Sequence, residues 1–245
     1  MMTTGDLDIV QRILADRPSF HEGGEARWDA LPQTIEAIRR SVKDSNTTLE
    51  VGVGVSTVVF AASGAVHTAI SPDPVEHARV REYCKRIGVD DSRLSFVVGF
   101  SDDVLPWLLS RERTLDVAFV DGAHSFPLPV VDWYYVTRSL KVGGRLFMDD
   151  IPIPAAGQMF RHMALEPNWR LDGIYDNRAA AFTLLALPKS GDDWSNQPFN
   201  KSYPDFSFAS RPQRLRLKTS HRLRETRRGL GARYPVLRRL YQRVT

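Results

Sequence analysis

The stretch Glu50-Val51-Gly52-Val53-Gly54-Val55-Ser56-Thr57 decides the fold of this 245-residue chain. It completes a predicted strand, Thr48–Gly52, and leads into a predicted helix, Ser56–Ala62. A strand that ends in glycines lets the backbone approach a ligand closely, and the next helix then begins at that ligand. The pattern therefore predicts the first strand–turn–helix unit of a Rossmann-like α/β domain, with a ligand at the turn.

The segments that follow alternate between strand-like and helix-like patterns as far as Leu187, which predicts a parallel sheet with crossover helices. The further parallel strands are predicted at Ala65–Ile70, Leu94–Val98, Leu115–Val120 and Arg145–Met148, the last one after a turn at Gly143-Gly144. Helices are predicted at Leu31–Val42, Pro74–Ile87, Asp103–Ser110 and Pro127–Leu140. Trp169–Ile174 and Ala180–Leu187 flank Asp176-Asn177-Arg178, and we predict that they form an antiparallel hairpin that completes a mostly parallel, seven-stranded sheet.

The composition fits a soluble globular protein, with 42% hydrophobic and 25% charged residues. We divide the chain into an N-terminal helical or lid segment (1–46), a ligand-binding domain (47–188), a linker or surface strap (189–212) and a basic amphipathic tail (213–245). The single cysteine, Cys84, cannot form an internal disulfide, which favours a reducing, cytoplasmic location. The acidic N-terminus predicts no signal peptide, and no apolar run is long enough to span a membrane.

The charge of the chain is concentrated at its C-terminal end. Residues 211–245 hold 12 Lys or Arg against one acid, Glu225, so this segment carries +11 while residues 1–210 carry −7 of the net +4. Apolar residues at helical spacing alternate with arginines near the end: Val236, Leu237, Leu240, Tyr241 and Val244. The pattern predicts a basic helix that lies on the inner, anionic membrane surface, or else packs on the core or on a second subunit in a homo-oligomer. Nucleic acid is a less favoured partner, because the acidic body shows no second basic region.

The glycine turn favours a particular kind of ligand. A dinucleotide site would have a third glycine for its pyrophosphate, which this turn lacks. Glu50 places a carboxylate beside the ligand, which suits an ammonium group better than a pyrophosphate, and Ser56 or Thr57 can cap the following helix. The alternative is a plain strand-to-helix turn.

The next two strand ends supply candidates for a nucleoside. Ser71 ends the second strand, where an acid usually holds ribose hydroxyls, and Asp73 two positions later can reach the ribose instead. After the third strand, Gly99-Phe100-Ser101-Asp102 can frame an adenine, with Phe100 stacking and Ser101 or Asp102 hydrogen bonding. The alternative for Phe100 is an ordinary core aromatic.

Carboxylates follow the fourth and fifth strands. Asp121-Gly122-Ala123-His124 comes after one, and Asp149-Asp150 after the other. Because parallel strands end at one edge of a sheet, Asp121, Asp149 and Asp150 should converge, and they repel each other unless a cation lies among them. Their oxygens suit Mg²⁺, or alternatively Mn²⁺ or Ca²⁺. His124 is then a candidate general base for a hydroxyl that the metal acidifies; the alternative is that these residues only cap and shape their loops.

Taken together, these residues resemble the class I S-adenosylmethionine-dependent methyltransferases, and more closely the bacterial metal-dependent O-methyltransferases whose relatives act on sugars, macrolide sugars and catechols. The resemblance covers about Leu31 to Leu187 and is most specific at Leu49–Thr57, Val120–Phe126 and Gly143–Asp150. It implies that Glu50 and the glycine turn, with Gly52 and Gly54, hold the methionine end of S-adenosylmethionine. It also implies that Asp121, Asp149 and Asp150 hold the metal and that His124 is the base.

The function predicted from these motifs is metal-assisted methylation of a hydroxyl on a small molecule or glycan, for example one carrying a vicinal diol. A catechol-type acceptor is the nearest rival. Two other classes stay open: an NAD-dependent oxidoreductase, and a non-catalytic ligand-binding protein that the basic tail tethers to a membrane.

Overall fold

The computed structural model describes residues 4–16, 18–21, 30–109, 112–187, 197–201, 206–207 and 209–233. Its helices are α1 (Thr4–Asp16), α2 (Pro32–Ser41), α3 (Val55–Ala62), α4 (Pro74–Ile87), α5 (Ser101–Leu108), α6 (Leu128–Ser139), α7 (Pro154–Leu165), α8 (Pro198–Lys201) and α9 (Arg211–Arg233). Its strands are β1 (Thr47–Val51), β2 (Val66–Ser71), β3 (Leu94–Val98), β4 (Leu115–Val120), β5 (Leu140–Met148), β6 (Trp169–Tyr175) and β7 (Ala179–Leu184). The chain divides into two compact units, Met1–Asn200 and Lys201–Thr245.

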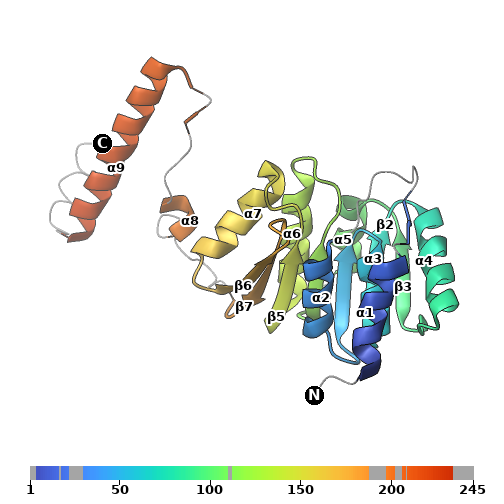
Figure 1. The fold of residues 1–245 in the computed structure, drawn as a ribbon. Helices are drawn as coiled ribbons and strands as arrows, with labels where there is room; N and C mark the ends of the chain where they lie inside the picture. The colour runs from blue at the N-terminus through green and yellow to red at the C-terminus, as the bar shows by residue number, and fades with distance from the viewer. Residues whose placement is uncertain are drawn as a thin grey trace. The chain divides into compact units, whose positions relative to one another are not determined.

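The first unit is built on a seven-stranded sheet in the order β3-β2-β1-β4-β5-β7-β6 (Figure 1). Strands β1 to β5 are parallel, whereas β7 runs antiparallel to both β5 and β6. The predicted mostly parallel sheet with a terminal antiparallel hairpin is therefore confirmed. The chain order reverses between β1, which pairs with β2 on one side, and its other neighbour β4. Open α/β sheets bind ligands beyond the carboxyl ends of the strands at such a point.

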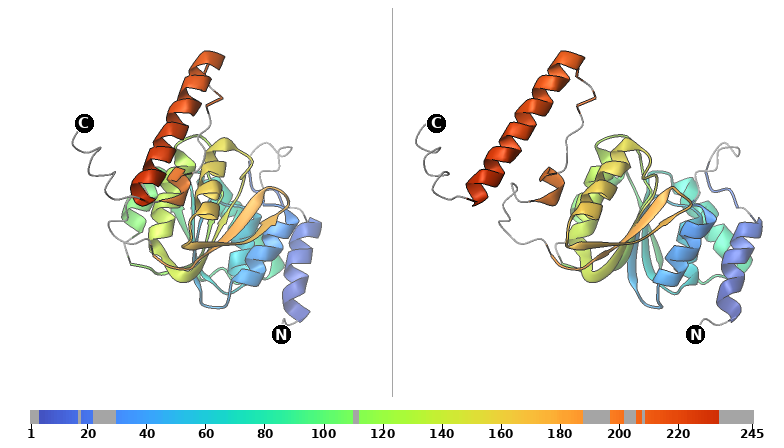
Figure 2. Two further views of the ribbon diagram at one scale, coloured as in Figure 1. Left: turned by 90° about the vertical axis from the view of Figure 1, so that its left-hand side faces the viewer. Right: turned by 60° about the vertical axis from the view of Figure 1, so that its left-hand side comes forward.

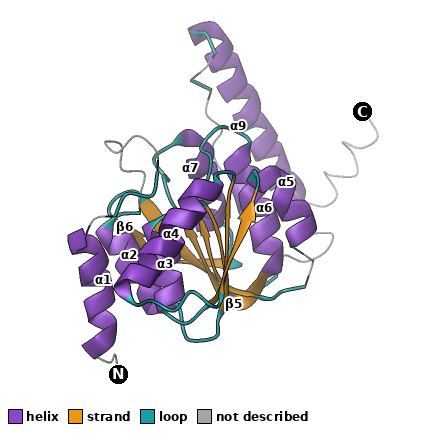
Figure 3. Ribbon diagram, turned by 90° about the vertical axis from the view of Figure 1, so that its right-hand side faces the viewer, coloured by secondary structure: helices purple, strands orange, loops and turns teal. Residues whose placement is uncertain are grey.

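Helices cover both faces of this sheet (Figure 3). Helices α1 to α4 pack on one face around Phe60, Val80 and Phe119, and α5 to α7 pack on the other around Leu105, Val136 and Leu146. Strand β4 is buried along nearly its whole length because it is covered from both sides, as its continuous apolar run predicts.

The hairpin of β6 and β7 reaches back to the start of α2 (Figure 2). Its turn residues Asp176 and Asn177 adopt φ values of 52° and 54°. Asp176 Oδ2 accepts hydrogen bonds from the backbone N–H of Thr34 (2.9 Å) and from its hydroxyl (3.0 Å). Since the N-cap residue of α2, Leu31, provides no side-chain cap, the hairpin turn supplies one from a distant part of the chain.

Some predicted boundaries are wrong. Gly143-Gly144 is not a turn before the fifth strand but lies inside β5, where Gly143 has φ 86° and the pairing with β4 shifts register. A bulge of this kind keeps the strand going where a turn would end it. Helix α5 begins at Ser101 rather than Asp103, and α9 begins at Arg211, inside the predicted linker. The apolar positions predicted between Val236 and Val244 lie outside the described residues. Among the helices described, none is both long and apolar enough to cross a membrane.

Candidate active site

A cleft of about 320 Å³ opens at the carboxyl ends of the parallel strands. It runs from the β1–α3 turn past the ends of β2 and β3 to the loops after β4 and β5. Most of the residues predicted for the cofactor, the base and the metal line it: Glu50, Gly52, Gly54, Ser56, Ser71, Asp73, Gly99, Phe100, Ser101, Asp121, His124 and Asp150. Thr57 and Asp149 lie behind this lining, both buried. One cleft thus joins motifs that are spread over a hundred positions of the sequence.

The glycine turn is pressed against the loop that follows β4. Gly52 has φ +107°, and a Cβ at this position would lie 2.4 Å from the carbonyl oxygen of Asp121. The backbone N–H of Asp121 donates to the carbonyl of Val51 at 2.9 Å. Only glycine fits this position, because both the backbone conformation and the space exclude a side chain.

The carboxylate of Glu50 is buried at the base of this turn, with 1% of the residue exposed. Its two oxygens accept hydrogen bonds from the hydroxyls of Ser56, at 2.7 Å, and Thr57. His67, a buried histidine that the motif analysis passed over, places Nε2 3.2 Å from Glu50 Oε1 and stacks on Phe60. Glu50 therefore fastens the start of α3 to β1, and its charge lies under the glycine turn.

A carboxylate that the sequence did not reveal lies beside the end of β2. Glu76, in the first turn of α4, lines the cleft and accepts a hydrogen bond from the hydroxyl of Ser71 at 2.7 Å. His21 Nδ1 lies 2.6 Å from its other oxygen. The predicted candidate Asp73 also lines the cleft, and its Oδ1 caps α4 by accepting from the N–H of Val75 at 2.8 Å. The available signal was the spacing of five residues between Ser71 and Glu76. The two side chains meet only because the chain turns into α4 between them.

The β3–α5 turn forms another wall of the cleft. Phe100 is 62% exposed there, so it is not a core aromatic. Ser101 is buried and begins α5, and Asp102 in the same turn also lines the cleft. An exposed ring beside polar side chains is a suitable platform for a flat heterocycle.

Behind this wall lies Asp132 of α6, which is fully buried. A Cβ on Gly122, in the loop after β4, would lie 3.4 Å from its Oδ2. Burial raises the pKa of Asp132 to about 6, although nearby Ser101 partly offsets this shift. The negative charge of this residue therefore costs stability at neutral pH.

Replacing Asp132 by asparagine is expected to stabilise the protein at neutral pH. Because the pKa of the carboxyl is higher in the folded state than in the unfolded chain, stability is lost as the pH rises from about 4 to about 6. A shift of this size corresponds to roughly 2–3 kcal/mol, so Asp132→Asn should gain on the order of that amount at pH 7.5 and little at pH 4. Urea unfolding at both pH values measures the gain; an equal effect at both would contradict the burial argument.

The loop after β5 presents two carboxylates that share one arginine. Arg178, next to the hairpin turn of β6 and β7, places Nη2 2.8 Å from Asp149 Oδ2 and Nε 2.9 Å from Asp150 Oδ1. The other oxygen of Asp149 accepts the backbone N–H of Asp150, a residue held at φ 51°. Asp149, 3% exposed, is thus held by one backbone hydrogen bond and one ion pair. Part of the positive charge that the sequence predicts among these carboxylates is therefore supplied by the guanidinium of Arg178.

A group of possible metal ligands lies beside this ion pair. One donor atom each of Asp121, His124 and Asp150 lie within 4.8 Å of one another, and His124 Nε2 is 2.6 Å from Asp150 Oδ2. Burial and the carboxylate of Asp149 raise the pKa of Asp121 well above its usual range. Three carboxylates with one arginine leave a surplus of negative charge, so the donor set fits a hard divalent cation with room for water or substrate oxygens. To join as a ligand, Asp149 would have to share its carboxylate with Arg178.

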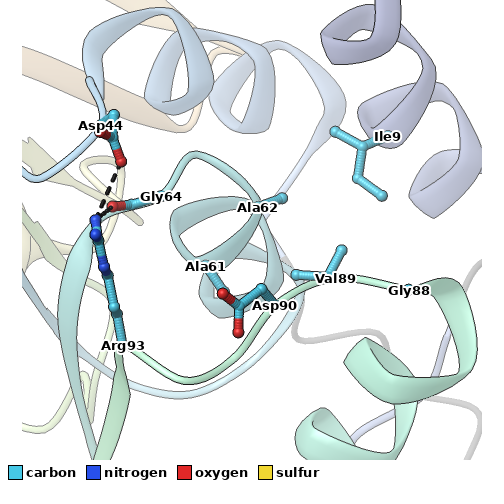
Figure 4. A pocket seen from close by; sticks show the side chains of 9 residues that line it. All are labelled: Ile9, Asp44, Ala61, Ala62, Gly64, Gly88, Val89, Asp90 and Arg93. Carbon is cyan, nitrogen blue, oxygen red and sulfur yellow. Dashed lines mark hydrogen bonds and ion pairs between the residues drawn. The ribbon is translucent and has the colours of Figure 1, made fainter.

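A second hollow lies at the opposite ends of the strands, lined by residues before β1, β2 and β3 (Figure 4). At this hollow the guanidinium of Arg93 donates hydrogen bonds to Asp44 at 3.2 Å, to Ser45 and to the carbonyl of Gly64. This arrangement ties the loops before three strands together and contains none of the predicted site residues.

Comparison with known proteins gives one family match. Residues 49–151 match the model of a family described as a methyltransferase domain. This range runs from β1 to just beyond the Asp149-Asp150 pair and so contains most of the cleft. None of the curated proteins matches the chain significantly.

Several solved structures share the fold. A protein from Corynebacterium glutamicum superposes with a TM-score of 0.55 at 14% identity, over 78% of this chain and 94% of that one. An O-methyltransferase from Bacillus cereus in complex with SAH has a TM-score of 0.53 at 14% identity, over 75% and 92% of the two chains. The O-methyltransferase TomG from Streptomyces achromogenes, in complex with SAM, gives 0.53 at 14% identity, over 76% and 92%. The resemblance to class I methyltransferases inferred from the sequence is confirmed by the family match and by this fold.

Proposed function

We propose that this class I methyltransferase uses S-adenosylmethionine to methylate a hydroxyl oxygen of a small molecule or glycan, assisted by a divalent cation. The observation that carries the proposal is the single cleft that joins the glycine turn at Gly52 to the donor group Asp121, His124 and Asp150. A nucleotide-binding cleft alone would suit many ligands, whereas a metal-ligand group at its end supplies a reason for an oxygen acceptor.

In this proposal the cofactor lies along the cleft in the order of the strand ends. The methionine end, with its ammonium group, takes the glycine turn above the buried charge of Glu50. The ribose takes the polar corner of Ser71 and Glu76, and the adenine lies against Phe100 with Ser101 in reach. The sulfonium methyl then points toward the loops after β4 and β5, where the acceptor binds.

Asp121 and Asp150 would hold the metal, either Mg²⁺ or Mn²⁺, since Mg²⁺ sites commonly use one or two carboxylates and retain several waters. When bound, the metal supplies a Lewis acid that lowers the pKa of an acceptor hydroxyl. A second, neighbouring hydroxyl would take another of its open positions, which favours vicinal diols of sugars and equally catechols. Arg178 holds the outer oxygen of Asp150, so that Oδ2 remains on the side of His124.

We assign to His124 the role of the base that accepts the hydroxyl proton of the acceptor. His124 Nε2 lies 2.6 Å from Asp150 Oδ2, and in the tautomer that carries the proton on Nε2, Nδ1 is left as an acceptor. The lone pair of the acceptor oxygen attacks the methyl carbon, the carbon–sulfur bond breaks, and its electron pair stays on sulfur as S-adenosylhomocysteine forms. The hydroxyl proton passes to His124. Fixing the two reactants in line supplies much of the acceleration in such a step.

Glu76 provides a test of the cofactor's placement. Glu76→Gln is expected to weaken S-adenosylmethionine binding about 10-fold, because a hydrogen bond to a charged group contributes roughly 1.5–3 kcal/mol. Calorimetry with the cofactor and with an analogue lacking the ribose hydroxyls measures the effect, which should vanish for the analogue. Glu82→Gln, an exposed position on the same helix, is the matched control. An equal loss for both ligands would place the ribose elsewhere.

The function itself is tested by calorimetry and by a transfer assay. The protein should bind S-adenosylmethionine but not NAD, and Mg²⁺ should increase methyl transfer to a member of a panel of polyols, catechols and lipid-linked glycans. Binding of NAD alone would point to an oxidoreductase. Binding of neither cofactor would leave a non-catalytic role, and transfer that chelators do not affect would remove the metal from the proposal.

A further inference from the structure

The helix α9 belongs to the second compact unit of the chain and carries a dense positive charge. Over residues 211–224 the sequence holds six cationic side chains and no acid, and all six are exposed or half-exposed: Arg211, Arg214, Arg216, Lys218, Arg222 and Arg224. In the part of the chain that the structure describes, none of them forms an ion pair. A group of like charges without acidic partners repels itself and favours contact with an anionic surface.

The same helix exposes apolar side chains on one side. Leu215 and Leu223 are 70% and 55% exposed, and Thr219 lies between them at a spacing of four residues from each. Residues four apart lie on one face of an α-helix, so the two leucines and the threonine methyl form a short apolar stripe. Arg216 and Arg222 are neighbours of this stripe in the sequence and flank it on either side. Leu217, 36% exposed, lies on the opposite side of the helix.

We propose that the stripe Leu215–Thr219–Leu223, with its flanking arginines, is a docking surface for a membrane containing anionic phospholipids. A helix that lies in the interface buries its apolar side at the boundary of headgroups and acyl chains and places its basic residues among the phosphates. An anionic membrane can therefore bind both the apolar stripe and the arginines of α9. Nucleic acid would neutralise the arginines but leave the leucines in water, and it has no apolar layer to receive them. The helix is too polar to span the bilayer, so the contact is peripheral.

The consequence for the chain is peripheral attachment to a lipid surface through the second unit, whatever acceptor the cleft takes. Binding of this kind gains contributions from each arginine and from each buried leucine, so both sets of side chains should affect it separately.

The test uses the full-length protein and sedimentation with vesicles of phosphatidylglycerol and phosphatidylcholine, compared with vesicles of phosphatidylcholine alone. The wild type should bind only the anionic vesicles, and less in high salt. Arg216→Gln with Arg222→Gln should lower the partition coefficient about 30-fold, since each charge near the surface raises the affinity about fivefold. Leu215→Gln with Leu223→Gln should lower it at least about 10-fold, because two exposed leucines would lose their burial.

Leu217→Gln is the matched control, because it makes the same chemical change on the other side of the same helix, and circular dichroism of each variant confirms that the helix persists. No binding to anionic vesicles, or an equal loss in Leu217→Gln and in the leucine pair, would overturn the proposal. Tight binding of an RNA or DNA oligonucleotide that the leucine pair does not weaken would assign the surface to nucleic acid instead. Salt-sensitive self-association without lipid would assign it to the acidic body of a second copy.

Discussion

Replacing Gly52 by alanine is expected to abolish cofactor binding and to lower the free energy of unfolding by about 3 kcal/mol. The reason lies in two independent constraints at one position. The φ of +107° is unfavourable for any residue with a side chain, and the added methyl would meet the carbonyl oxygen of Asp121 at 2.4 Å. Neither partner can move easily, because both atoms belong to backbone at the ends of buried strands. Relief would require β1 and β4 to separate, which opens the floor of the cleft.

Gly88→Ala is the matched control for this variant. Gly88 also has a positive φ, 76°, at the end of α4, but nothing lies within 4 Å of a Cβ built there. Alanine at this position should therefore cost only the backbone conformation, about 1 kcal/mol, and leave cofactor affinity unchanged. Chemical unfolding and calorimetry with S-adenosylmethionine measure both effects. Wild-type affinity in Gly52→Ala would show that the turn is not where the cofactor binds.

The parts of the site that follow strands could be predicted from the sequence. Gly52 and Asp121 come directly after segments with a strand pattern, and Phe100 and Asp150 come one residue later. Because all parallel strands end at the same edge, the position of a residue after its strand is enough to place it at the cleft. The periodic pattern likewise predicted α2 to α6 within about two residues of their bounds, whereas α7, which also covers the sheet, was not predicted.

The parts that depend on contacts between distant segments could not be predicted. Arg178 comes directly after a hairpin turn, and its local sequence indicates only that turn. It reaches the Asp149-Asp150 pair because β7 inserts between β5 and β6 and runs antiparallel, a strand order that no local pattern encodes. His67 and Glu76 were missed for a similar reason. A histidine within a strand and an acid within a helix show no sign of their partners until the fold brings Glu50 and Ser71 to them.

The sequence predicts a metal ion among Asp121, Asp149 and Asp150, and this stays a prediction. In the structure, Arg178 provides one positive charge for Asp149 and Asp150. The remaining carboxylate, Asp121, is held by burial and by its neighbours in an environment that disfavours its charge. A protein that needed only a stable loop there would gain from a neutral residue. A carboxylate in so unfavourable an electrostatic setting is typical of a functional position.

A second large effect is expected at Asp121, where stability and activity change in opposite directions. Asp121→Asn keeps the size of the side chain and removes the disfavoured charge, so the metal-free variant should unfold at a higher temperature than the wild type at neutral pH. The same change removes a ligand, and methyl transfer should fall at least about 100-fold, because a metal contributes several kcal/mol to such a step. Calorimetry without and with Mg²⁺ and an initial-rate assay measure the two effects; Asp103→Asn, an exposed acid in the first turn of α5, is the control. If the variant is less stable than the wild type without metal, or retains wild-type turnover, Asp121 is not a metal ligand whose charge destabilises the metal-free protein.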